Sequence, residues 1–338
     1  MLLRTVTIYN YKSFAPEPQT ITLGPGFNIL FGQNNAGKTA ALEAIALQVE
    51  NKPHRSRHTV PAANGPVSLG ESFVEFTFTV EAAELWMLLR QVGTFWLPLP
   101  RTKEAGLDSH EEAELRRFGD WVLSQTPLTF TYTFRNNNLY PSKFPSFGLY
   151  DALITSAGQV SSAACTADPS EQKLRSATST ATDRNGEFGS VLAQTLRSRL
   201  YLFKAERRIG PSALTASEDL ASDASNLASV LNRLQANPVR FERFRKLVRE
   251  VFPAIQAVSV RPKSGSELEV LLWFDEPDIE REDLAIPVGE AGTGTGQVLA
   301  ILYVALTAQT PRTIIVDEPQ NFLHPGAVAN LIGICKRF

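Results

Sequence analysis

The segment Gly32-Gln-Asn-Asn-Ala-Gly-Lys-Thr39 has the residue types and spacing of a phosphate-binding loop, G-x-x-x-x-G-K-[ST]. Glycines allow backbone N–H groups to curl around phosphate oxygens, and the start of the following helix adds partial positive charge. In such a loop the Lys38 ammonium reaches the β- and γ-phosphates and the Thr39 hydroxyl ligates Mg²⁺. The segment therefore predicts a nucleoside triphosphate site. Its expected residues are Gly32, Asn34, Asn35, Ala36, Gly37, Lys38, Thr39 and Ala40.

Two apolar runs each end in Asp-Glu-Pro, and each could supply a carboxylate metal ligand and a general base. They are Leu271-Leu-Trp-Phe-Asp-Glu-Pro277 and Thr313-Ile-Ile-Val-Asp-Glu-Pro319. An apolar strand that ends in Asp-Glu can present a magnesium ligand and a general base. One nucleotide needs one such pair, so the two copies are expected to differ in purpose.

The surroundings favour the second copy. Upstream of Asp317, the Gly-rich segment Gly289–Gln297 opens the apolar helix Val298–Ala308, and a parallel strand, Thr313–Val316, follows. We therefore expect Asp317 and Glu318 to carry the chemistry.

The first copy has a different context. Its strand, Leu268–Phe274, is expected to form an antiparallel hairpin with Ala257–Val260, and the polar run 276–283 after it is typical of a solvated loop. Asp275 and Glu276 are therefore predicted to form an acidic turn after an edge strand.

Length and composition limit the classes of protein to which this chain can belong. The chain has 338 residues, enough for about two domains, with 43% apolar and 20% charged residues and a net charge of −2. These values are typical of a soluble globular protein without global basicity. Two cysteines, Cys165 and Cys335, are too few for a disulfide framework and fit a reducing cytoplasm. No apolar helix candidate approaches the about 20 residues of a membrane span, so no membrane association is expected.

Several elements are expected to position these residues. Alternating or short apolar runs predict strands, and residues that recur on one face predict helices. One helix has a clear start, with Asn237 as its N-cap and Pro238 at its first position. The expected strands are Leu3–Tyr9, Thr20–Leu23, Phe27–Phe31 and Phe73–Val80, and the expected helices include Ala40–Val49, Ala82–Val92 and Asn226–Gln235.

The middle of the chain has a different composition. Thr155–Ser190 is dominated by Ser, Ala and Thr and contains almost no large apolar residue. Such a segment is not expected to bury a core, so we predict a mobile insertion or long loop.

The motifs together resemble the ABC-type ATPase heads of the SMC, RecF and OLD group. The resemblance covers roughly 1–60 and 200–338. It is carried by the phosphate loop, by Arg4–Phe14, by Asn226-Leu-Ala-Ser-Val-Leu, by Gly292-Thr-Gly-Thr-Gly-Gln-Val-Leu and by the run Ile314-Ile-Val-Asp-Glu-Pro that leads to Leu323-His-Pro.

The resemblance implies an α/β fold: a P-loop NTPase head of ABC type, with a mixed core sheet, a smaller antiparallel β lobe and a variable inserted region. Residues 1–100 would form the N-terminal part of the head, 101–199 the insertion, and 200–338 the C-terminal part.

The resemblance also implies roles for single residues. Asp317 would hold Mg²⁺, Glu318 would act as general base, and Lys38 would be catalytic. A signature loop would contact the γ-phosphate bound by the opposite subunit. His324 would lie at the dimer interface, although a helix-capping or surface histidine is an equal alternative. The signature loop would comprise Gly294, Thr295, Gly296 and Gln297.

The sequence departs from these heads in three places. Gly294 stands where the pattern usually has Ser, so the hydroxyl would come from Thr295 or be absent. Gln91 is only one candidate for the glutamine of the lid loop. The chain reaches Phe338 without the further core strand and switch histidine of these heads, so a fragment is expected, and it shows no sign of the TOPRIM-type nuclease of OLD proteins.

Basic segments suggest contacts with nucleic acid, because arginine-rich surfaces attract phosphate backbones. Candidates are 54–58 and Arg240–Arg249, together with Arg207 and Arg208. A solvated or ion-paired surface is the alternative for Arg240–Arg249 and for Arg207 and Arg208.

The function implied is ATP binding and hydrolysis that drive head-to-head dimerisation in a DNA-associated repair or anti-phage defence system. The expected partners are a second copy, DNA, and a nuclease domain or partner protein, in the cytoplasm. The alternatives are an ATPase subunit of a transporter and a non-hydrolysing switch module.

Overall fold

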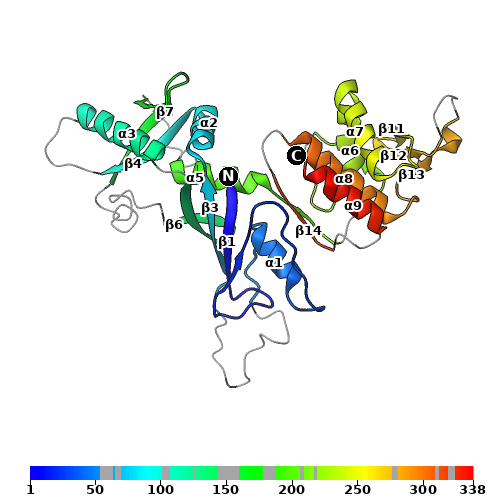
Figure 1. The fold of residues 1–338 in the computed structure, drawn as a ribbon, viewed down its shortest axis with the longest axis horizontal. Coiled ribbons are helices and arrows are strands. Elements are labelled where there is room, and N and C mark those ends of the chain that lie inside the picture. The colour runs from blue at the N-terminus through cyan, green and yellow to red at the C-terminus, as the bar shows by residue number, and fades with distance from the viewer. Residues whose placement is uncertain are drawn as a thin grey trace. The chain divides into compact units, whose positions relative to one another are not determined.

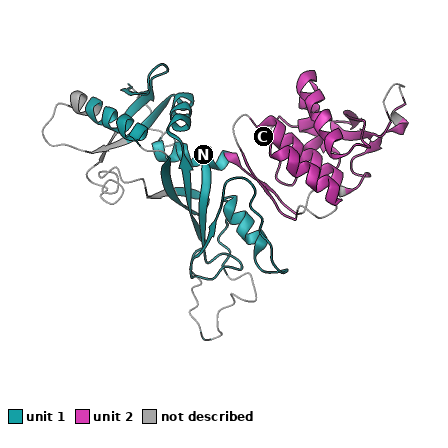
Figure 2. Cartoon of the chain, in the orientation of Figure 1, with its two compact units in different colours: residues 1–198 teal, residues 199–338 magenta. Residues whose placement is uncertain are grey.

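The computed structural model describes residues 1–53, 64, 70–100, 107–124, 127–143, 160–177, 187–205, 209–216, 219–275, 281–308, 312–318 and 324–337. The chain divides into two compact units, residues 1–198 and 199–338 (Figure 2).

Unit 1 is built on a five-stranded antiparallel sheet in the order β2-β1-β3-β5-β6 (Figure 1). The strands predicted at Leu3–Tyr9, Thr20–Leu23 and Phe73–Val80 are confirmed as β1, β2 and β3, whereas β5 and β6 were not predicted. In β3 every second residue from Val74 to Val80 is buried, and the residues between them are partly exposed. Aromatic rings such as Phe78 and Phe130 stack on the buried face, whereas Thr77 and Thr131 share a hydrogen bond on the other. The strands are β1 (Leu2–Tyr9), β2 (Gln19–Thr22), β3 (Phe73–Val80), β5 (Leu128–Arg135) and β6 (Asn138–Lys143).

The helices of unit 1 bury one face each. The predicted helix at Ala82–Val92 is confirmed with the same bounds. The first helix ends at Ile45 rather than Val49, and Leu47, two residues beyond, has a left-handed backbone (φ 54°). The helices are α1 (Lys38–Ile45), α2 (Ala82–Val92), α3 (Leu107–Ser124) and α5 (Phe188–Arg199).

A second sheet corrects the prediction of a long loop at Thr155–Ser190. Strands β4 (Thr94–Pro100), β7 (Val160–Ala167) and β8 (Leu174–Ser176) form an antiparallel sheet in the order β4-β7-β8. In β7, Ala163, Ala164 and Cys165 are buried. The prediction was wrong because backbone hydrogen bonds need no large side chains, and large rings from other elements supply the apolar volume. These rings include Phe95, Phe118 and Phe188.

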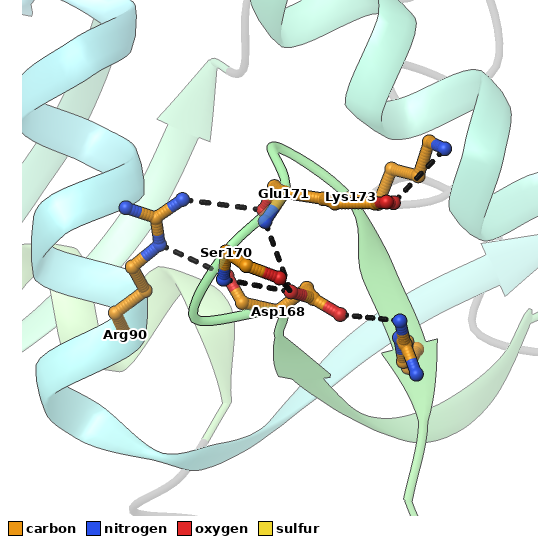
Figure 3. Close-up of polar contacts among 6 residues, drawn as sticks. Arg90, Asp168, Ser170, Glu171 and Lys173 are labelled. Carbon is orange, nitrogen blue, oxygen red and sulfur yellow. Dashed lines mark hydrogen bonds and ion pairs between the residues drawn. The ribbon is translucent and has the colours of Figure 1, made fainter.

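The turn between β7 and β8 is held by Asp168 (Figure 3). Its carboxylate accepts hydrogen bonds from the Ser170 hydroxyl at 2.7 Å and from the backbone N–H groups of Ser170 and Glu171 at 2.8 and 2.9 Å. Arg175 lies 2.6 Å from the other carboxylate oxygen, and Arg90 of α2 donates to the carbonyls of Asp168 and Glu171. The turn is thereby fixed to α2.

The predicted strand at Phe27–Phe31 is not formed. The segment belongs to no helix or strand, and Ile29 and Phe31 are 82% and 93% exposed. An apolar run becomes a strand only beside a partner that accepts its hydrogen bonds, and no described strand of unit 1 pairs with it.

Unit 2 contains two sheets. The parallel pair β9 (Leu200–Phe203) and β14 (Thr313–Val316) confirms the predicted parallel strand before Asp317. The hairpin β11 (Ala257–Ser264) and β12 (Glu267–Trp273) is confirmed as antiparallel, with a first strand that is longer than predicted and a second strand shifted by one residue. β12 is not an edge strand, because β10 (Ser212–Ala213) and β13 (Ile286–Pro287) pair along its other side.

The helices of unit 2 pack around one apolar core. Asn226 and Asn237 stand at the helix starts expected from the sequence, and the Asn237 side chain accepts a hydrogen bond from the Arg240 N–H at 3.1 Å. Among the described residues, no helix combines the length and apolar character that crossing a bilayer requires. The helices are α6 (Leu227–Gln235), α7 (Pro238–Val251), α8 (Thr293–Thr307) and α9 (Pro325–Cys335), with a 3₁₀ turn at Glu282–Leu284.

Candidate nucleotide site

The phosphate loop of unit 1 leads directly into α1. Gly37 caps the helix in a left-handed conformation (φ 89°), and Asn35 also has a positive φ of 64°. A Cβ on Gly37 would lie 2.9 Å from the Ser13 Cβ, so neither the backbone nor the space admits a side chain there. Both the positive φ and the close approach of Ser13 therefore require glycine at this position of the motif.

Lys38 folds back over its own loop. Its ammonium donates to the carbonyl oxygens of Gly32 and Gln33, both at 2.9 Å. Residues 32–36 and Thr39 are exposed, whereas Ala40 is buried against the sheet side of α1. A triphosphate could therefore reach the loop and offer Lys38 stronger, anionic partners than these neutral carbonyls.

The segment after β1 supports this loop, a role that sequence reasoning missed. The Tyr11 hydroxyl donates to Glu43 of α1 at 2.6 Å, and Lys12 forms an ion pair with the same carboxylate. Burial and the hydrogen bond to Glu43 raise the pKa of Tyr11 well above its usual range, so it stays a neutral donor. Ser13 then packs against Gly37. In the sequence, the signal for this supporting role is the run Tyr11-Lys-Ser13, which enters the prediction only as part of the segment Arg4–Phe14 that carries the family resemblance.

Asp317 and Glu318 follow β14 in unit 2. Asp317 is 5% exposed, and its N–H extends the parallel ladder to the Phe203 carbonyl at 3.0 Å. Glu318 is exposed and has a left-handed backbone, φ 51°, which is rare for a residue with a side chain. Such conformations persist where the surroundings impose them, and they are common at functional sites.

The predicted signature loop is the first turn of α8, not a loop before the helix. The helix starts at Thr293 after Gly292 (φ 92°), five residues before the predicted Val298. Gly294 and Gly296 are buried and Thr295 is partly exposed. Gln297 is 3% exposed. The ligand role of Gly294–Gln297 stays a prediction.

His324 caps α9. Its Nδ1 accepts a hydrogen bond from the Gly326 N–H at 3.2 Å, which is the capping alternative stated above. Its place at a dimer interface stays a prediction.

The remaining candidates divide between surface positions and residues outside the described ranges. Asp275 is exposed in the segment after β12, as predicted, and Gln91 is exposed near the end of α2. On α7, Arg245 and Arg249 each lie 3.3 Å from Glu242, which favours an ion-paired surface. Segment 54–58, Arg207, Arg208, Glu276 and residues 319–323 lie outside the described residues.

The structure places the phosphate loop in unit 1 and Asp317, Glu318 and the α8 turn in unit 2. Within the described ranges, no three His, Cys, Asp or Glu side chains gather as a metal site.

A family model described as "AAA domain, putative AbiEii toxin, Type IV TA system" matches residues 168–338, just over half of the chain. The chain belongs to this AAA-domain family. A second model, "AAA domain", matches residues 5–84 and so includes the phosphate loop.

Two curated relatives match a short part of this AAA domain. The DNA replication and repair protein RecF of Limosilactobacillus fermentum is 39% identical over 56 residues, and that of Geobacillus kaustophilus 38% over 56 residues. Each match spans 17% of this chain and 14% of the relative. The family models and these relatives confirm the predicted resemblance to AAA-type ATPases and to RecF.

Two crystal structures of Smc heads are similar to the whole chain. One is bound to the C-winged helix domain of ScpA (TM-score 0.46, 13% identity), and covers 100% of this chain and 86% of that one. The other, with an extended coiled coil, is bound to the C-terminal domain of ScpA derived from Pyrococcus furiosus (TM-score 0.44, 12% identity). That match covers 99% of this chain and 86% of the Smc chain. At these scores the likeness supports no further conclusion.

Proposed function

We propose that this AAA domain binds and hydrolyses ATP with Mg²⁺, and that ATP closes a head-to-head homodimer that acts on DNA. The observation that carries the proposal is the phosphate loop: a left-handed Gly37 starts α1, and Lys38 lies over the exposed loop. This arrangement brings a helix start and a cation to an exposed loop, which suits a triphosphate.

Roles for this chain's residues follow from their chemistry. Lys38 would exchange its carbonyl partners for phosphate oxygens, and Thr39 and Asp317 would hold Mg²⁺. The metal would offset the negative charge of the phosphates. Glu318, exposed and held in an unusual backbone conformation, would accept the proton of the attacking water. The support is the family match, the loop geometry and the buried, ladder-bound Asp317.

Dimerisation is supported by the second glycine-rich helix start, at Gly292 and the first turn of α8. A helix N-terminus favours an anion. In a twofold dimer each such turn would contact the ATP on the other chain, an isologous arrangement. The DNA link rests on the two RecF relatives, which are named for DNA replication and repair.

The first experiment tests the nucleotide site. Lys38→Ala removes the cation that meets the β- and γ-phosphates, so we expect loss of hydrolysis and a sharp loss of ATP affinity in titration calorimetry. Lys52→Ala, which removes a surface lysine paired with Glu50 in the same unit, serves as the control. Unchanged ATP affinity in Lys38→Ala would overturn the assignment of the loop.

The second experiment tests the dimer. Glu318→Gln keeps the shape of the side chain but removes the base, so it should retain ATP and accumulate as a dimer. Light scattering of the full-length variant with Mg-ATP measures the mass, and Lys38→Ala/Glu318→Gln should stay monomeric. A monomer with ATP bound, at tens of micromolar protein, would contradict the dimer. Turnover that DNA does not change would contradict the link to DNA.

A further inference from the structure

The first turn of α8 holds a glycine, Gly296, where any larger residue would require Ile209 to shift. A Cβ on Gly296 would lie 2.4 Å from the Cγ2 and 2.7 Å from the Cδ1 of Ile209. Real Cβ atoms do not approach other atoms so closely. Ile209 itself is partly buried and packs on the core of unit 2. The side chain of Ile209 thus occupies the space beside the helix start.

The same short segment also touches the chain before α8. A Cβ on Gly289 would lie 3.6 Å from the Ile209 carbonyl oxygen and 4.0 Å from the Gly210 Cα. Gly289 precedes α8, and Gly296 lies in its first turn. Ile209 therefore lies beside both glycines, and Gly210 lies beside Gly289.

Strand pairing fixes this segment on its C-terminal side. Strands β10 and β13 both pair along one side of β12: Ser212 pairs with Leu268, and Pro287 pairs with Leu271. Val288 continues that edge, because its N–H donates to the Val270 carbonyl at 2.9 Å. The segment before β10 and the segment after β13 thereby meet beside β12, around a cavity of about 150 Å³.

On its N-terminal side the segment continues from β9. Phe203, the last residue of β9, pairs with Val316 and accepts the Asp317 N–H. Ile209 follows six residues later in the sequence, and residues 206–208 between them lie outside the described ranges.

We propose that Ile209 is a positioning residue: its contact with Gly296 sets the start of α8 and thereby the position of this turn. The inference rests on the proposed function, in which the turn contacts nucleotide bound by a second chain. A well-packed contact of this kind has one favoured arrangement, so a displacement of either partner moves the other.

A double-mutant cycle tests the contact. In the Glu318→Gln background we compare the parent, Gly296→Ala, Ile209→Ala and the double variant, by light scattering with Mg-ATP and by thermal unfolding. Gly296→Ala forces overpacking, so we expect an ATP-dependent dimer about tenfold weaker while ATP binding is retained. Ile209→Ala makes room for the new methyl group, so the double variant should recover most of the dimer. Gly333→Ala on α9, where a Cβ meets nothing within 4 Å, is the control.

The outcomes separate the two proposals. A parent that does not dimerise overturns the proposed dimer and, with it, the role of Ile209. A parent that dimerises while Gly296→Ala dimerises equally well overturns the positioning role alone, even if that variant is less stable. Failure of the double variant to recover, with normal unfolding, also overturns it. Recovery of dimer affinity without a matching change in melting temperature supports positioning, because a merely structural contact would move both together.

Discussion

Asp275 and Asp317 are both followed by Glu-Pro in the sequence, but their surroundings differ in the structure. Asp317 is buried and bound to the Phe203 carbonyl through its N–H, whereas Asp275 is exposed in the segment after β12. We predict that Asp317→Asn loses Mg²⁺-dependent hydrolysis, because the amide is a poor substitute for a carboxylate ligand. Asp275→Asn should stay within about twofold of wild type, since exposed loop substitutions usually cost little. Steady-state ATPase assays on both variants measure this, and the opposite result would exchange the roles of the two motifs.

The contribution of Asp168 to the stability of the fold is predicted to depend on pH. The hydrogen bond from the Ser170 hydroxyl, those from the Ser170 and Glu171 N–H groups, and the Arg175 charge lower the pKa of Asp168 to about 2. Because its folded pKa is depressed, its stabilisation is complete above the unfolded pKa of about 3.9 and is lost as pH falls towards 2. The melting temperatures of wild type and Asp168→Ala should therefore differ above about pH 5 and converge near pH 2.

The control for this prediction is Asp120→Ala, which removes an exposed carboxylate from α3. Its melting temperature should follow wild type across the same range. A constant gap between wild type and Asp168→Ala from pH 5 to pH 2 would contradict the assignment of the stabilisation to the ionised carboxylate.

At single residues the sequence predicted the phosphate loop well and the second glycine-rich segment less well. The loop motif predicts the local backbone conformation, because the position of Gly37 requires a positive φ and Lys38 must follow it directly. The burial of Gln297 and the capping contact of His324 depend instead on tertiary packing and local geometry, which spacing does not reveal.

Elements with local signals were predicted closely. The start of α7 is an example, since Asn237 is the N-cap and Pro238 occupies the first turn. We predict that Asn237→Ala lowers the free energy of unfolding by about 1 kcal/mol, because the Arg240 N–H loses its acceptor. Asn237→Asp keeps an acceptor and should stay close to wild type. Chemical denaturation measures both, and equal losses in the two variants would show that the cap contributes nothing.

Elements that depend on distant partners were predicted poorly. Phe27–Phe31 has the composition of a buried strand, but without a paired strand its backbone stays irregular and its apolar side chains stay exposed. The small residues of β7 gave the opposite error, because Phe95, Phe118 and Phe188 provide the apolar volume that β7 lacks. Both errors arise because composition describes a segment and not the surface it packs against.

For the whole molecule, the proposed dimer predicts a dependence on concentration. If a second chain completes each nucleotide site, ATP turnover per chain should rise with protein concentration over about three decades and then reach a plateau. Asp275→Asn should follow the same curve. Turnover per chain that is constant over this range would show that one chain suffices for hydrolysis.

The parallel pairing of β9 with β14 also constrains how unit 2 is assembled. Leu200 pairs with Thr313, more than a hundred residues further along the chain, whereas the β11–β12 hairpin and the α6–α7 pair join neighbours in sequence. Closing a long loop costs chain entropy before the contacts repay it, so local structure forms first. During refolding, the hairpin and helices should gain protection from hydrogen exchange before the N–H groups of β14. Asp317 would then reach its place after most of the unit has formed around it, so the capacity to hold a metal ion would arise late in folding.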